Sequence, residues 1–301
     1  MTTIRIVVST DERYAMPTAA SVRSIIDSRA PGEALHIVVL ASDLSAPTRA
    51  RLLRSWTAEP SCAVTFTPVD LTRFAGLPTT SAVGAQVTTG VYARLLIADL
   101  LPADWDRVIY LDSDTITRAP LSDLWTTDLH TNPLGAVRDD YVPTIASPYG
   151  LPSWREAGLA AELPYFNSGV LLLDLDAWRR DRLGEQAIRY LLEHRADIRL
   201  FDQDALNAVA AGRWRQLDTI WNVTGYWRKP ERRTGAHRDI LTTARIRHFA
   251  GTGKPWQPQP LDVPDAHLFF DSLARTDWAT PPGPRQRTTQ GPAGLEPTCA
   301  G

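Results

Sequence analysis

The stretch R-V-I-Y-L-D-S-D, residues 107–114, decides how this 301-residue chain folds. Val108–Leu111 is a run of four apolar residues, the pattern of a strand that is buried on both faces of a sheet. The strand ends in Asp112, Ser113 and Asp114, and isolated burial of such charges would be costly without a partner. In open α/β sheets, ligands bind beyond the carboxyl ends of the strands. We therefore expect an α/β fold with a ligand site at the end of this strand.

The segments before this stretch alternate between strand and helix patterns. Short β-rich runs lie at residues 4–9, 36–40 and 63–69. Between them, residues 17–29 and 45–56 place apolar side chains at helical spacing. This order predicts a Rossmann-like, mainly parallel central sheet with helices on both faces. No G-x-G-x-x-G motif follows the first strand, which argues against a classical dinucleotide site.

The segments after residue 80 continue the alternation. The apolar patterns predict helices over 89–100, 182–194 and 203–211, and strands over 134–137 and 170–175. From residue 281 to 301 the composition changes to Pro, Gly, Thr, Gln and Arg, with almost no large apolar residue. Such a segment cannot bury enough surface to offset its ordering entropy, so we predict a disordered tail.

The bulk composition excludes several classes of protein. Lys and Arg number 32 and Asp and Glu 34, a balance that does not favour a nucleic-acid partner. Two cysteines, Cys62 and Cys299, make a disulfide framework improbable. No run approaches the ~20 apolar residues that cross a bilayer. The apolar run at 4–8 is followed at once by charged residues, unlike a signal peptide. We expect a cytoplasmic protein without a transmembrane segment.

Asp112 and Asp114 form the motif that points to chemistry. Residues two apart on an extended chain point the same way, so both carboxylates can face one ion. Oxygen ligands of this kind suit Mg²⁺ or Mn²⁺, which bridges phosphate oxygens. The alternative is an ordinary turn at a strand end, where aspartates are common. The two aspartates alone leave both interpretations open.

Six motifs, taken together and in order, resemble glycosyltransferase family 8, the retaining galactosyl- and glucosyltransferases that include lipopolysaccharide galactosyltransferases and glycogenins. The motifs are V-V-S-T-D-E-R-Y-A (7–15), V-Y-A-R-L (91–95), V-I-Y-L-D-S-D (108–114), Y-F-N-S-G-V-L-L-L-D-L (165–175), D-Q-D-A-L-N (202–207) and H-F-A-G-T-G-K-P-W (248–256). The resemblance implies the GT-A fold, with one catalytic domain over residues 1–265. A C-terminal extension over 266–280 and the tail over 281–301 would follow it.

The resemblance also implies roles for individual residues. Asp112, Asp114 and His248 match the family's metal ligands. The donor nucleotide and its phosphates would be bound by Ser9, Thr10, Asp11, Arg94, Asp112, Ser113, Gly251, Gly253 and Lys254. The residues around the transferred sugar would be Asp139, Asn167, Asp202 and Gln203. Two positions depart from the best-known pattern, with Gln86 where a histidine is frequent and Arg13 where an asparagine is usual.

The implied activity is the transfer of glucose or galactose from a UDP-hexose, with Mn²⁺ or Mg²⁺ as cofactor. The acceptor, a sugar, lipid or small molecule, is not identified. Gln203 matches the residue nearest the β face of the sugar, and because an amide is a poor nucleophile, front-side attack is the favoured mechanism. One alternative is a haloacid-dehalogenase-like phosphotransferase, whose nucleophile loop resembles residues 111–116. That loop normally closes the first strand of its domain, whereas three strands precede it here. The other alternative is a sugar-nucleotide-binding or self-glycosylating protein.

Overall fold

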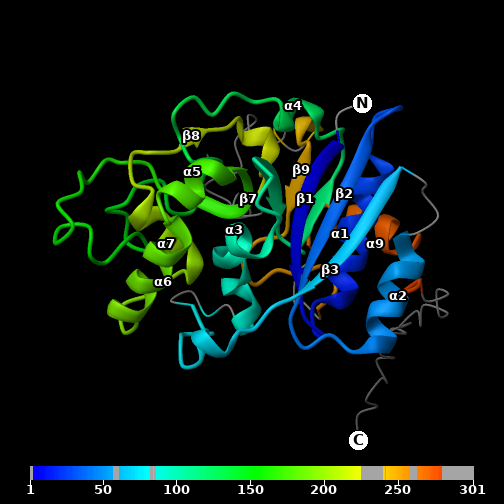
Figure 1. Ribbon diagram of the computed structural model, residues 1–301, viewed down its shortest axis with the longest axis horizontal. Coiled ribbons are helices and arrows are strands. Elements are labelled where there is room, and N and C mark those ends of the chain that lie inside the picture. Colours follow the sequence, from blue (N-terminus) through cyan, green and yellow to red (C-terminus); the bar gives the residue numbers. More distant parts are fainter. Residues whose placement is uncertain are drawn as a thin grey trace, which may run out of the picture.

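A seven-stranded sheet in the order β3-β2-β1-β4-β7-β6-β8 forms the centre of the fold (Figure 1). The computed structural model describes residues 3–56, 61–81, 84, 86–224, 240, 242–257 and 263–279. The strands of this sheet are β1 (Thr3–Thr10), β2 (Ala34–Ala41), β3 (Cys62–Pro68), β4 (Arg107–Leu111), β6 (Leu134–Arg138), β7 (Phe166–Asp174) and β8 (Arg215–Gln216). Only β7 runs antiparallel to its neighbours, β4 and β6, so the predicted mainly parallel sheet is confirmed.

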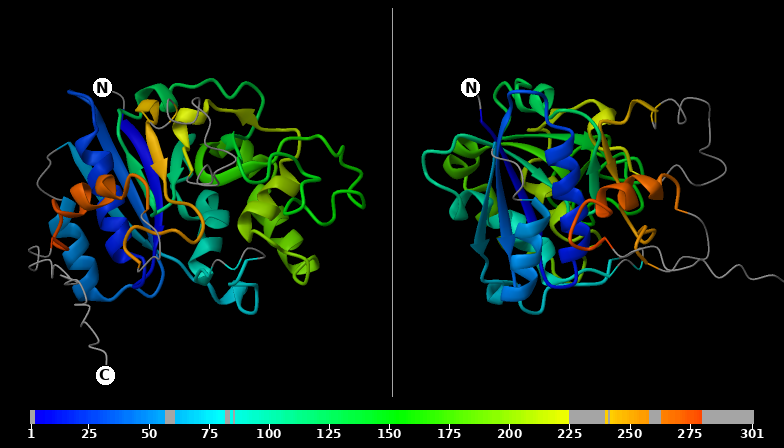
Figure 2. Two further views of the ribbon diagram at one scale, coloured as in Figure 1. Left: turned by 180° about the vertical axis from the view of Figure 1, so that it is seen from behind. Right: turned by 90° about the vertical axis from the view of Figure 1, so that its right-hand side faces the viewer.

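Helices cover both faces of this sheet, as predicted (Figures 1 and 2). One face carries α1 (Ala15–Asp27), α2 (Ala46–Trp56) and α4 (Ser122–Trp125), and α9 (Ala266–Leu273) packs against α1. The other face carries η2 (Thr89–Leu96), α3 (Ile97–Leu100), α5 (Leu175–Arg180), α6 (Leu183–Glu193) and α7 (Asp202–Val209). Two short 3₁₀ turns, η1 (Thr72–Phe74) and η3 (Thr219–Trp221), are further helical elements.

Strand β4 is buried on both faces, as its apolar run predicted. Val108 and Tyr110 pack into the core beneath η2 and α6, whereas Ile109 and Leu111 pack into the core beneath α1. All four side chains have no exposed surface. The strand therefore ends inside the molecule, and the residues that follow it meet the solvent only through a cleft.

A separate two-stranded ribbon connects the end of β4 to a distant part of the chain. It consists of β5 (Thr115–Thr117) and β9 (Ile246–His248), which pair antiparallel with Thr115 opposite His248. The backbone N–H of Phe249 donates to the carbonyl oxygen of Asp114 at 2.9 Å. Because β5 begins directly after Asp114, this pairing places the His248 side chain next to the two aspartates.

The structure differs from the sequence prediction over residues 89–100. The single helix predicted there is a 3₁₀ helix, η2, followed by one turn of α-helix, α3. Thr89, Gly90 and Val91 are weak α-helix formers, which favours the tighter start. The tail predicted over 281–301 lies outside the described residues. Within the described part of the chain, no helix is long and apolar enough to span a membrane.

Candidate metal and donor-sugar site

Two adjoining cavities lie beyond the carboxyl ends of β1 and β4. Of the predicted site residues, the first cavity is lined by Ser9, Thr10, Asp11, Arg94, Asp112, Ser113, Asp114 and Lys254. The second is lined by Arg94, Asp112, Asp114, Asp139, Asn167, Asp202, Gln203, His248, Gly251 and Lys254. Arg94, Asp112, Asp114 and Lys254 belong to both, so the cavities form one cleft with two compartments. Gly253 lines neither of them.

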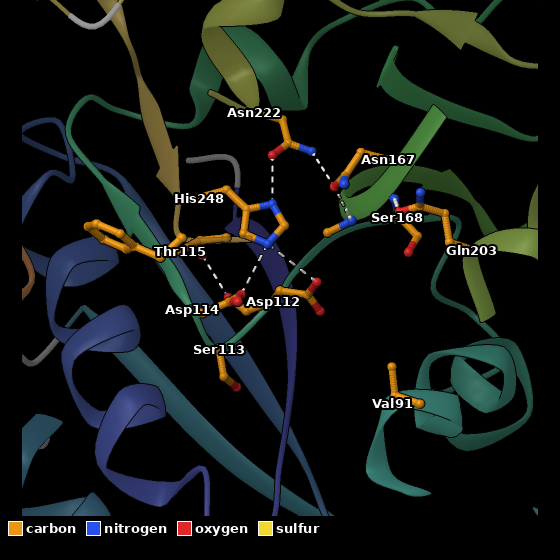
Figure 3. A network of polar contacts seen from close by, with 12 residues as sticks. Val91, Asp112, Ser113, Asp114, Thr115, Asn167, Ser168, Gln203, Asn222 and His248 are labelled. Atoms are coloured by element: carbon orange, nitrogen blue, oxygen red, sulfur yellow. Dashed lines mark hydrogen bonds and ion pairs between the residues drawn. The ribbon is translucent and has the colours of Figure 1, made fainter. Parts of the chain in front are cut away.

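Asp112, Asp114 and His248 come together where the two compartments meet. Their ligand atoms all lie within 4.8 Å of one another. His248 Nε2 lies 3.1 Å from Asp114 Oδ1 and 3.8 Å from Asp112 Oδ2 (Figure 3). Two carboxylates and one imidazole are a donor set that suits Mn²⁺ or Mg²⁺. These side chains therefore fit one divalent cation, which they would hold at the centre of the cleft.

The other ring nitrogen of His248 faces Asn222, directly after η3. Nδ1 lies 2.9 Å from Asn222 Oδ1. When Nδ1–H donates this hydrogen bond, Nε2 is the ring nitrogen that faces the carboxylates and that can bind a cation in place of its proton. A metal-binding histidine in proteins almost always has such a partner for its second nitrogen. The surroundings of His248 therefore agree with a ligand role.

Gly169 in β7 leaves the space beside these three side chains open. A Cβ at this position would lie 2.3 Å from His248 Cε1 and 2.8 Å from Asp112 Oδ2. Separations under 3.0 Å essentially never occur for a real Cβ, so any side chain at this position would displace a ligand. The glycine thus keeps the two ligand side chains free to approach one ion.

A buried guanidinium, that of Arg94, joins Asp112 to Asp202. Its Nη2 donates to Asp112 Oδ1 at 2.7 Å, and its Nε lies 3.0 Å from Asp202 Oδ2. The Tyr110 hydroxyl also donates to Asp112 Oδ1, at 2.9 Å, which leaves Asp112 Oδ2 toward His248. Burial raises the pKa of Asp202 to about 6, although Arg94 acts in the opposite direction. Arg94 therefore orients Asp112, and a contact with the donor stays a prediction.

Lys254 already contacts the metal-ligand group. Its Nζ donates to Asp114 Oδ2 and, at 2.9 Å, to the carbonyl oxygen of Phe249. Burial by itself raises the pKa of Asp114, but the charges of Lys254 and His248 outweigh it and hold this pKa well below its usual range. Asp114 is therefore a carboxylate at neutral pH, the form that a cation requires. A metal ion would share this carboxylate with Lys254 or displace its ammonium group.

Asp139, Asn167 and Gln203 form a connected network in the second compartment. Asp139 Oδ2 accepts hydrogen bonds from Asn167 Nδ2 at 3.0 Å and from Gln203 Nε2 at 3.1 Å. Gln203 Oε1 accepts from the backbone N–H of Ser168 at 3.1 Å. The Ser168 hydroxyl donates to Asp202 Oδ2 at 2.9 Å. The four residues predicted to surround the sugar thus lie together, as carboxylates and amides that can pair with hydroxyl groups.

The loop after β1 forms a wall of the first compartment. Asp11 Oδ1 accepts from the backbone N–H of Tyr14 at 2.9 Å, which fixes the carboxylate at the cavity edge. The Ser113 hydroxyl donates to the carbonyl oxygen of Ser9. Ser113 therefore holds the aspartate pair against β1 and has its hydroxyl hydrogen already engaged.

Several residues of the site were not predicted from the sequence. Ser168, Gly169 and Tyr110 lie inside motifs that were recognised, but none of them was predicted as a site residue. Asn222 lies between residues 215 and 245, where the sequence has no readable pattern, and no local signal could have identified it. Ser168, Gly169 and Asn222 act through contacts between elements that are far apart in the chain, whereas Tyr110 contacts Asp112 two residues later.

Comparisons with known proteins show what this chain is similar to. The model of the glycosyl transferase family 8 matches residues 5–259. General stress protein A of Bacillus subtilis is 26% identical over 286 residues, covering 92% of this chain and 95% of that protein. Probable galacturonosyltransferase-like 7 of Arabidopsis thaliana is 29% identical, covering 86% and 74%. A crystal structure of the galactosyltransferase LgtC with donor and acceptor sugar analogues has a TM-score of 0.75 and 28% identity, covering 91% and 96%.

Proposed function

The chain belongs to glycosyltransferase family 8, and we propose that it is a retaining, metal-dependent hexosyltransferase that uses a UDP-sugar donor. The observation that carries this proposal is the grouping of Asp112, Asp114 and His248 at the junction of two compartments. One compartment is lined by Asp11, Arg94 and Lys254, which match residues that contact the donor nucleotide, and the other is lined by groups that pair with sugar hydroxyls. The bond to be broken would lie between them.

The chemical demand is the departure of a diphosphate from the anomeric carbon. A divalent cation held by the three ligands would supply Lewis-acid stabilisation of the leaving group. Lys254, buried beside Asp114, would place a second positive charge at the same phosphates. A preorganised contact of this kind is typically worth about 10²–10³ in rate. Arg94 and Tyr110 keep Asp112 oriented and need no rearrangement during the reaction.

The position of Gln203 supports front-side attack. Both atoms of its amide are engaged, the nitrogen with Asp139 and the oxygen with the backbone N–H of Ser168. An amide is a weak nucleophile, and this one is held by two partners. We infer that Gln203 stabilises the sugar as positive charge develops, while the acceptor hydroxyl attacks from the face that the diphosphate leaves.

The charges of the second compartment favour a neutral hexose. Among its described residues, the positive or titratable basic groups are Arg94, His248 and Lys254, and each already contacts an aspartate. Asp139 and Asp202 add two more carboxylates. A uronic acid would bring its own carboxylate toward these groups, and like charges at close range repel. We therefore infer glucose or galactose as the donor sugar, although several relatives are named probable galacturonosyltransferase-like.

A donor-hydrolysis screen tests the proposal. Purified protein would be incubated with UDP-glucose, UDP-galactose, UDP-glucuronate and UDP-galacturonate, each with Mn²⁺, with Mg²⁺ or with EDTA. We expect release of UDP from one of the neutral donors, with metal and not with EDTA. The Asp114→Asn variant is the control for contaminating hydrolases. Release that persists in EDTA, or that favours a uronate donor, would contradict the proposal.

The two alternative functions are addressed by other observations. The family match sets aside the phosphotransferase alternative. Self-glycosylation predicts that the protein gains mass in steps of one hexose when incubated with donor and metal alone, which intact-protein mass spectrometry detects. The acceptor class and a cytoplasmic location stay predictions.

A further inference from the structure

We propose that Asn222 is a positioning residue that accepts a hydrogen bond from His248 Nδ1–H and so holds the ring with Nε2 turned toward Asp112 and Asp114. The proposal rests on the metal-dependent function above, but it concerns the protein before any metal binds. His248 is 3% exposed and Asn222 2% exposed, so water cannot readily replace the contact between them. Asn222 belongs to none of the motifs that resemble the family.

A chain of hydrogen bonds that begins at Asp139 determines which end of the Asn222 amide, oxygen or nitrogen, faces His248. An amide has nearly the same shape at its oxygen and its nitrogen, so its partners decide which end faces where. Asp139, as a carboxylate, only accepts, and it faces Asn167 Nδ2 at 3.0 Å. The backbone N–H of Gly169 only donates, and it lies 3.0 Å from Asn167 Oδ1. Both neighbours therefore fix Asn167 in one orientation.

The orientation passes from Asn167 to the histidine ring (Figure 3). Asn167 Oδ1 accepts from Asn222 Nδ2 at 2.9 Å, so the oxygen of Asn222 is the end that remains for His248. That oxygen lies 2.9 Å from His248 Nδ1, which must carry the proton to donate. Nε2 then faces Asp114 Oδ1 at 3.1 Å. Without an ion the Nε2 proton is donated to this carboxylate, and a cation would take the place of that proton. Without the bond from Nδ1–H to Asn222, the ring would lose the contact that turns Nε2 toward the metal position.

The residues that fix this chain also line the sugar compartment. Asp139 and Asn167 face the second cavity, and Asn222 connects them to the metal ligand. The hydrogen bonds that bind the sugar and those that orient the histidine therefore share one buried network. This network orients His248 through Asp139, Asn167 and Asn222 rather than through Asp112 or Asp114.

Substitutions at Asn222 separate an orienting role from a merely structural one. In Asn222→Leu the ring has no acceptor for Nδ1–H, so the contact that turns Nε2 toward the metal position is lost. Asn222→Asp keeps that acceptor but loses the Nδ2–H from which Asn167 Oδ1 accepts, so it is a partial rescue. Asn207→Leu is the matched control, because Asn207 is a buried amide that binds the backbone of Phe166 and Gln203 and does not touch His248. Thermal unfolding confirms that each variant is folded.

The first measurement is Mn²⁺ affinity, from the EPR signal of free Mn²⁺, in the absence of donor. Loss of such a histidine partner typically weakens metal affinity 10–100-fold. We expect that loss for Asn222→Leu, a smaller loss for Asn222→Asp, and wild-type affinity for Asn207→Leu. Equal affinity in Asn222→Leu and the wild type, or an equal loss in Asn207→Leu, would overturn the proposal.

The second measurement is the Nδ1 proton of His248, from nitrogen NMR of the metal-free protein with labelled histidine. The His248 signal is assigned by its absence in His248→Gln. We expect a protonated Nδ1 in the wild type and in Asn222→Asp, and an unprotonated Nδ1 in Asn222→Leu, whose ring keeps only the Nε2 proton, donated to Asp114. An unprotonated Nδ1 in the wild type would refute the proposal. This readout needs neither metal nor turnover, so it distinguishes failure of the relay from failure of the proposed function.

Discussion

Replacing Gly169 by alanine should damage the metal site more than the fold. The new Cβ would lie 2.3 Å from His248 Cε1, whereas ordinary contacts begin at 3.4 Å, so the ring must move by about 1 Å. The same Cβ would also crowd Asp112 Oδ2 at 2.8 Å. A displacement of this size in a catalytic group costs on the order of 10²-fold in rate. Overpacking a core position costs about 1–3 kcal/mol of stability.

Gly135→Ala is the matched control for this prediction. Its Cβ would lie 2.8 Å from Leu129 Cδ2 and 3.1 Å from Leu217 Cδ2, so it also overpacks the core but touches only apolar side chains. We expect both variants to unfold at lower temperature than the wild type, and Gly169→Ala alone to lose Mn²⁺ affinity and donor hydrolysis. If Gly169→Ala bound Mn²⁺ as tightly as Gly135→Ala, the reasoning about this space would be wrong.

Three further predictions concern the groups around the ligands. Gln203→Ala should lower the rate of transfer without abolishing it; activity as low as that of Asp112→Asn would argue for a covalent intermediate on this residue. Asp202, with its pKa raised to about 6, binds a proton more tightly in the folded than in the unfolded protein. The free energy of unfolding of the metal-free wild type should therefore fall relative to that of Asp202→Asn as pH rises from about 4 to 6. A pKa difference of about 2 between the folded and unfolded protein corresponds to on the order of 3 kcal/mol. Unfolding free energies of the two proteins that run parallel over this pH range would contradict the prediction. Lys254→Met should weaken UDP binding about 10–100-fold, the value of a lost charged hydrogen bond, and tighten Mn²⁺ binding without nucleotide, because Asp114 loses its competing partner. Calorimetry measures both affinities, and weaker Mn²⁺ binding would count against that competition.

The fold was largely readable from the sequence because its signals are local. The apolar run Val108–Leu111 predicted a strand buried on both faces. That prediction did not require knowing which elements pack against the strand. The 3₁₀ geometry of η2 was not readable, because helical spacing of apolar side chains is similar in a short 3₁₀ and a short α-helix. Arg94 illustrates a second limit. A helical arginine is normally solvated. This one is buried because it forms ion pairs with Asp112 and Asp202, which belong to two other parts of the chain.

The metal site shows how far the residues alone could lead. The spacing of Asp112 and Asp114 predicted that both could face one ion, whereas His248 came only from the family resemblance. Strands β5 and β9 have three residues each, too few for a periodic pattern, yet their pairing is what brings the imidazole to the aspartates. Asn222 had no signal at all, since its contact exists only once η3 and β9 are packed together.

The most direct test of the account is pulsed EPR of Mn²⁺ bound to the protein, because it detects nitrogen ligands on the ion itself. We predict one bound Mn²⁺ with a ¹⁴N coupling that disappears in His248→Gln, and much weaker binding in Asp112→Asn and Asp114→Asn. Tight binding without a ¹⁴N coupling, or a coupling that survives in His248→Gln, would show that these three side chains do not hold the ion together.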